Sequence, residues 1–208
     1  MTGASADFFI VNYHTNGADA PSFFESDWTP GVPEFHYPSE TPDESQFASA
    51  YKVKAKIKEL KADLMIEELL ATDAVLNICA TLEIPHITRQ VEIELKGKKT
   101  PEKRYNLFVP TARLSLLDLE HSVFTIDRDK YTGKLKTPEE SDVPAIVFES
   151  IESFKIKPGI HQHLFLCTDI NETVCSAEFK AMFESKALFG LAFTPLDTTY
   201  KFDPWGEL

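Results

Sequence analysis

Residues 51–58, with the sequence YKVKAKIK, alternate strictly between apolar side chains and lysine. Because successive side chains of a β-strand point to opposite faces, this alternation predicts a strand with one buried and one solvated face. A rival helical stripe runs through Val53, Ile57, Leu60 and Leu64, but the strict alternation and the β-branched residues favour a strand. Exposed lysines are typical of edge strands, so we expect this strand at the edge of a sheet.

Other segments rich in aromatic and β-branched residues predict further strands, over 8–13, 87–95, 104–117, 123–127, 161–167 and 191–193. Two helices are expected to begin at Thr72 and Ser176, because each of these N-cap residues precedes an apolar stripe with helical spacing. Gly190 lies just past the second helix and is expected to stop it. Hairpins with two or three covering helices predict an α+β fold with a mostly antiparallel sheet.

The chain of 208 residues suits a single domain over 1–208. Residues 1–50 form an acidic N-terminal segment, and we expect its residues 14–50 to be an ordered, irregular loop, punctuated by proline and packed through its aromatic residues; residues 51–208 form the body. Within the body, a capped helix followed by a strand occurs twice, which indicates possible quasi-repeats over 51–117 and 150–199. Chance recurrence of such short elements is the alternative, and it is the one that we favour.

The net charge is −12, and residues 1–50 hold eight acidic residues and no Lys or Arg. Such a segment accelerates association with a basic partner and repels nucleic acid, so we expect a basic protein partner and no nucleic acid. The candidate partner-binding residues are Glu25, Asp27, Glu34, Glu40, Asp43 and Glu44. A solvated surface that only keeps the protein soluble is the alternative.

The sequence favours a reducing, cytoplasmic location. Its three cysteines include no CxxC pair, so buried thiols are expected rather than disulfides. No apolar stretch reaches the ~20 residues of a membrane helix, and the N-terminus has no basic region of the kind that opens a signal peptide.

Two groups of residues could carry enzyme chemistry. His161, His163 and Cys167 alternate on one predicted strand and are possible zinc ligands, but Phe165 interrupts them and a fourth ligand is not evident. Asp118, His121 and Ser122 combine an acid, a base and a hydroxyl, although a turn with a capping Asp or Ser explains the same residues. We therefore expect no catalytic residues, no metal and no cofactor.

Two runs of the sequence carry a resemblance to a known family. The first extends from Arg104 to Ser122 and includes Asp118; the second extends from His163 to Pro195. The shared motif residues are Asp118, Ser122, Ser176, Gly190, Phe193 and Pro195. In this order the motifs resemble the eleventh immunity-protein family of bacterial polymorphic toxin systems.

This resemblance implies a non-enzymatic protein that binds and neutralises a cognate toxin. An acidic face would suit a toxin with a basic active site. The alternatives are a small enzyme built on Asp118, His121 and Ser122, and an adaptor module of a secretion-associated assembly. The oligomeric state is not indicated.

Overall fold

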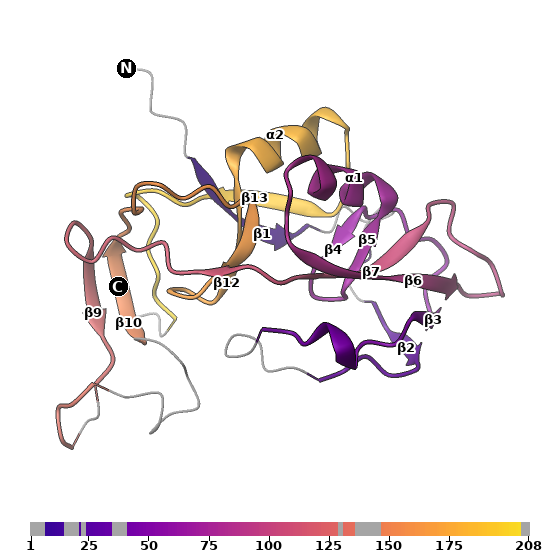
Figure 1. Ribbon diagram of the computed structural model, residues 1–208, viewed down its shortest axis with the longest axis horizontal. Helices are drawn as coiled ribbons and strands as arrows, with labels where there is room; N and C mark the ends of the chain where they lie inside the picture. The colour runs from indigo at the N-terminus through magenta and orange to yellow at the C-terminus, as the bar shows by residue number, and fades with distance from the viewer. Residues whose placement is uncertain are drawn as a thin grey trace.

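The computed structural model describes residues 7–14, 21, 24–34, 41–128, 131–135 and 147–204. Two sheets lie side by side, and two helices cover them from the same side (Figure 1). In spatial order, one sheet consists of β2 (Ser26–Thr29), β3 (Ala50–Ala55), β6 (His86–Glu94), β7 (Tyr105–Pro110), β5 (Leu70–Thr72) and β4 (Leu64–Met65). The other consists of β13 (Leu191–Pro195), β1 (Phe8–Tyr13), β12 (Glu172–Ser176), β11 (Leu164–Cys167) and β8 (Arg113–Leu114).

A separate ribbon of β9 (Val123–Ile126) and β10 (Phe148–Ser153) lies at one end of the molecule (Figure 1). The helices are α1 (Asp73–Thr81) and α2 (Ala177–Ser185), with a 3₁₀ turn, η1, at Glu44–Gln46. These elements confirm the α+β class. The sheets are mixed, because β3 pairs with β6, and β11 with β8, in parallel, whereas the other pairs are antiparallel. In the part of the chain that the structure describes, no helix is long and apolar enough to cross a membrane.

The strand of alternating lysines is internal, so its expected place at a sheet edge is wrong. β2 pairs with β3 on one side and β6 pairs with it on the other. Carboxylates on the neighbouring strands accommodate the lysines: Lys52 lies 3.0 Å from Glu92, and Asp27 is the register partner of Lys54. β2 belongs to the acidic N-terminal segment, so residues 26–29 form a strand where an irregular loop was expected.

Strand β1 is apolar on both faces because both are buried. Phe9 and Val11 contact the core beneath the two helices, whereas Phe8 and Ile10 contact the core on the opposite side of the sheet. The core beneath the helices also contains Phe108 of the other sheet. One apolar core therefore joins the two sheets.

The same unit of hairpin, helix and strand occurs twice. In the first unit the hairpin β4–β5 leads into α1, and in the second the hairpin β11–β12 leads into α2. The residue before each hairpin binds the residue before each helix. Asp63 Oδ1 accepts from Thr72 Oγ1 at 3.0 Å, and His163 Nδ1 lies 2.8 Å from Ser176 Oγ. The matching backbone bonds, Thr72 N to Asp63 O and Ser176 N to His163 O, are 2.8 and 3.0 Å long.

Asp63 also connects the two units. Its buried carboxylate accepts from Lys103 Nζ at 2.7 Å and from the backbone N–H of Phe189 at 2.9 Å. Its backbone N–H donates to the Phe189 carbonyl at 2.7 Å. Phe189 follows α2, so one side chain ties the start of the first unit to the end of the second helix.

Gly190 does not stop the second helix as the sequence suggested. α2 ends at Ser185, and the left-handed residue after it is Ala187, with φ 49°. Gly190, with φ +108°, instead lies where the chain crosses the first unit, and a Cβ built on it would lie 2.7 Å from the Leu64 carbonyl oxygen. Close approach of two backbones, combined with a positive φ, requires glycine at this position.

Replacing Gly190 with alanine tests this contact. We expect Gly190→Ala to lower the free energy of unfolding by about 1–3 kcal/mol more than Gly159→Ala, because overpacking adds to the backbone strain. Gly159 is a matched control, since it also has a positive φ (+79°) but a Cβ there would meet nothing within 4 Å. Urea unfolding of both variants measures the difference, and equal losses would contradict the close approach.

Candidate functional site: an acidic hollow between two hairpins

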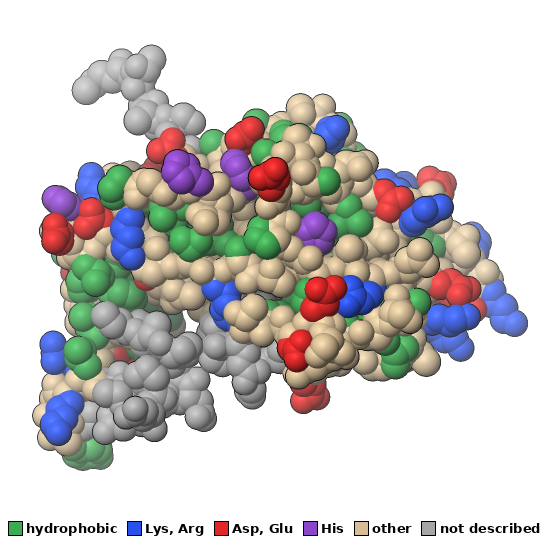
Figure 2. Space-filling model, in the orientation of Figure 1, with side chains coloured by type: hydrophobic (Ala, Val, Ile, Leu, Met, Phe, Trp, Pro, Cys, Tyr) green, Lys and Arg blue, Asp and Glu red, His purple; other side chains and the backbone are tan. Residues whose placement is uncertain are grey.

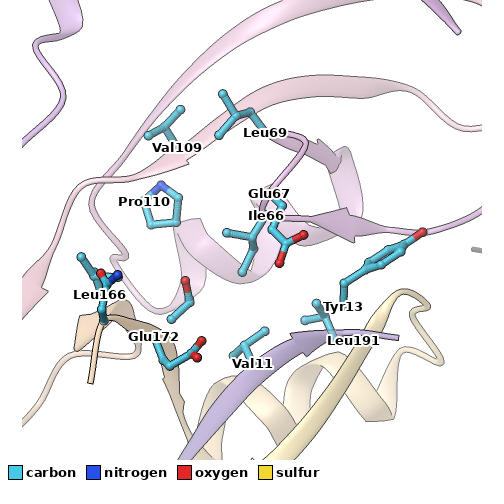
Figure 3. A pocket seen from close by; sticks show the side chains of 12 residues that line it. Val11, Tyr13, Ile66, Glu67, Leu69, Val109, Pro110, Leu166, Glu172 and Leu191 are labelled. Atoms are coloured by element: carbon cyan, nitrogen blue, oxygen red, sulfur yellow. The ribbon is translucent and has the colours of Figure 1, made fainter. Parts of the chain in front are cut away.

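A hollow of about 350 Å³ opens where the two repeated hairpins face each other (Figure 3). The turn of β4–β5 lies on one side and the end of β11 with the start of β12 on the other; β1, β7 and β13 complete the wall. Most of the residues that line it are apolar, and two, Glu67 and Glu172, carry carboxylates. The lining consists of Val11, Tyr13, Ile66, Glu67, Leu69, Val109, Pro110, Leu166, Asn171, Glu172, Thr173 and Leu191. Tyr13 contributes its ring, while its hydroxyl donates to the Pro21 carbonyl at 2.8 Å.

The carboxyl groups of Glu67 and Glu172 point into this hollow from opposite sides (Figure 3). Glu67 comes from the turn of the first unit and Glu172 from the first residue of β12 in the second. Both side chains are solvent-accessible, and among the described residues neither has an ion-pair or hydrogen-bond partner. Two unpaired anions therefore face one partly apolar space.

The walls and the neighbouring carboxylates make ionisation unfavourable here. Partial desolvation raises the pKa of Glu172 above its ordinary value, and the negative charge of Glu67 adds to this effect. Desolvation and the charge of Glu67 likewise raise the pKa of Glu68, the residue that follows Glu67 in the sequence. Burial, with a contribution from the charge of Glu172, raises the pKa of Tyr200 to about 12. A cation would relieve these interactions.

Several of the predicted partner-binding acids are paired within the chain. Glu25 forms an ion pair with Lys56, and Glu44 Oε1 lies 3.0 Å from Arg89 Nη1. Asp43 Oδ1 accepts from Ser45 N at 2.9 Å as the cap of η1, and this bond lowers the pKa of Asp43. Acidic and basic side chains accordingly lie side by side at the end of the molecule that the six-stranded sheet forms (Figure 2).

The other predicted acids differ in how far their carboxylates are exposed and unpaired, and so in how readily a partner can contact them. Asp27 is exposed on β2 opposite Lys54. Glu34 is exposed and, within the described residues, has no ion-pair or hydrogen-bond partner. Glu40 lies outside the described residues. Of the five that are described, Glu34 is therefore the most available for contact.

The candidate triad does not assemble. Asp118 Oδ2 lies 2.8 Å from His121 Nδ1, and this bond holds the pKa of Asp118 below its ordinary value. The hydroxyl of Ser122 instead bonds the backbone of Lys155, accepting from its N–H at 3.0 Å and donating to its carbonyl at 3.3 Å. Asp118 and Ser122 thus shape the turn before β9, as the capping alternative predicted.

The candidate zinc ligands are also separated. β11 begins at Leu164, so the predicted strand is too long at its start, and exposed His161 lies outside it. His163 is engaged with the helix cap, while Cys167 is buried, and burial raises the pKa of its thiol to about 12. Within the described ranges, no group of His, Cys, Asp and Glu residues could hold a metal ion. All three cysteines are free and buried.

The remaining motif residues have structural roles. Ser176 Oγ accepts from Phe179 N at 3.1 Å as the predicted N-cap of α2. Phe193 packs edge to face on Phe183 with ring centroids 5.8 Å apart, and Pro195 ends β13 opposite Phe9. Ser176, Phe193 and Pro195 therefore stabilise α2 and β13.

No family model matches the sequence, and a search of curated proteins found no matching relative.

Sequence reasoning did not select Glu67 and Glu172, which are 105 positions apart (172 − 67). The signal available was weak: an acidic pair, Glu67-Glu68, between the apolar runs 64–66 and 69–71. Only the pairing of the strands brings Glu172 to the same space.

Substitution of Glu172 tests whether this carboxylate is unpaired. Its raised pKa means that the folded state binds a proton more tightly than the unfolded chain, so the wild type gains stability as the pH falls through that raised pKa. Glu172→Gln removes the titration. We expect the variant to be more stable than wild type at about pH 7, with the advantage lost near pH 4, below the ordinary glutamate pKa.

Urea unfolding at both pH values measures this difference, with Glu152→Gln as the control. Glu152 is exposed on β10, and its replacement should stay within about ±0.5 kcal/mol at either pH. A Glu172→Gln variant that is less stable than wild type at neutral pH would mean that Glu172 has a favourable partner in the folded chain.

Proposed function

We propose that this protein is a non-enzymatic immunity protein that binds a bacterial protein toxin in the cytoplasm and neutralises it. The observation that carries the proposal is the pair of exposed carboxylates of Glu67 and Glu172 in one hollow, neither of which has an ion-pair partner among the described residues. Like charges held together without cations reduce stability, and a basic partner that supplies cations gains affinity from the same arrangement. The motif resemblance to an immunity-protein family points in the same direction.

The acidic N-terminal segment adds to this role. Glu25 and Glu44 are partly neutralised by Lys56 and Arg89, so they contribute less to a long-range field than their number suggests. Exposed Glu34 and Asp27 keep the surface negative. Charges at the rim of an interface chiefly raise the association rate, so we assign these residues to steering the toxin rather than anchoring it.

The stoichiometry of neutralisation tests the proposal. We expect the product of a gene encoded beside this one to arrest growth when expressed alone, and co-expression of this protein to restore growth. With purified components, toxin activity should fall linearly to zero at about one equivalent of this protein, because an inhibitor that acts by binding is consumed in the complex.

The variant Asp118→Asn/His121→Ala separates binding from catalysis. These residues form the exposed acid–base pair of the enzyme alternative, and their loss should leave the titration unchanged. Inactivation of the toxin by far less than one equivalent, abolished in this variant, would contradict a binding mechanism. Failure to restore growth beside any neighbouring gene product would also overturn the proposal.

A further inference from the structure

We propose that the hollow between the two hairpins receives one lysine or arginine side chain of the toxin, held by Glu67 and Glu172. This inference rests on the proposed function and names the contact that would anchor the complex.

The hollow is large enough to admit a long side chain. A volume of about 350 Å³ is at the lower end of the range of ligand pockets, about 300–1,000 Å³. Glu67, Asn171 and Glu172 of its lining are exposed to solvent, so a side chain projecting from another protein can enter while its backbone stays outside. A single inserted anchor that fills a pocket is a common form of binding hot spot.

The walls match the two chemical parts of such a side chain. Val11, Leu69, Val109, Leu166 and Leu191 offer an apolar surface to the methylene stem. Lysine and arginine bury such stems against apolar surface while their charged heads reach polar groups. The arrangement therefore selects an aliphatic cation over either a neutral apolar group or an anion.

The two carboxylates are placed to hold the charged head. Glu67 and Glu172 approach from different repeats, so a cation between them bonds to both sides of the hollow at once. Charge-assisted hydrogen bonds to carboxylates are about twice as strong as neutral ones, and a guanidinium offers donors in several directions. Within the described residues, neither carboxylate has a cation of its own chain to displace.

A small probe tests the hollow in the free protein, independently of any toxin. n-Butylguanidinium carries the stem and head of arginine, and n-butylurea is its neutral counterpart of nearly the same shape. We expect butylguanidinium, and not butylurea, to cause saturable NMR shifts of the methyl groups of Val11, Leu69, Val109, Leu166 and Leu191. Glu67→Gln/Glu172→Gln should abolish these shifts.

The same variant tests the hollow in the complex. Glu67→Gln/Glu172→Gln should weaken toxin affinity at least tenfold, equivalent to about 1.4 kcal/mol. Glu149→Gln/Glu152→Gln is the control, because it removes the same charge from exposed positions of β10 outside the hollow and should change affinity by less than about twofold.

The outcomes separate this inference from the proposed function. Absence of selective probe binding would overturn the hollow as a cation site while toxin neutralisation stands. Selective binding of butylguanidinium, together with unchanged toxin affinity in Glu67→Gln/Glu172→Gln, would show that the hollow binds a small cation and not the toxin, and would overturn the inference. If no toxin is neutralised, the inference fails together with the proposed function.

Discussion

The buried carboxylate of Asp63 is the interaction on which the arrangement of the two units depends. It accepts from Thr72, Lys103 and Phe189, which belong to the helix start of the first unit, the approach to β7 and the chain after α2. Removing this carboxylate would leave the Thr72 hydroxyl and the Phe189 N–H without their acceptor, and a buried polar group left unsatisfied costs about 1–3 kcal/mol. An Asp at this position therefore fixes three segments that no local propensity would bring together.

The hydrogen bonds of Asp63 also determine how the turns of the two hairpins are placed. Asp63 and Gly190 hold the two units close at one end, and the shared core beneath α1 and α2 continues the contact. The turns of the two hairpins then stand apart across a hollow whose carboxylates are held in place by the scaffold. Functional surfaces commonly retain such unfavourable groups at the expense of stability, and Glu67 and Glu172 fit that description.

Local patterns predicted the elements well, and long-range pairing explains what they missed. The cap at Ser176 and the alternation that begins at Tyr51 predicted a helix and a strand from neighbouring residues alone, whereas the Thr72 hydroxyl makes no cap bond to α1 and instead donates to Asp63. The alternation could not show that β2 covers β3, because the charge complementarity that favours this pairing joins an acidic segment to a lysine strand some 25 residues later. The expected partner-binding role of that segment overlooked the same complementarity.

The hollow and the role of Gly190 lay beyond sequence reasoning for a related reason. Glycine after a helix ordinarily indicates a helix stop, but here the steric demand comes from Leu64, in the other repeat. Glu67 and Glu172 likewise become a pair only through the fold. The site is therefore a property of how the two units are joined, and neither unit contains it alone.

A structure of this protein in complex with the toxin that we propose as its partner is the sharpest test of the cation site. The account predicts a lysine or arginine side chain of the toxin between the carboxylates of Glu67 and Glu172, with its stem against Val11 and Leu191. A complex in which the toxin binds elsewhere and solvent occupies the hollow would contradict it.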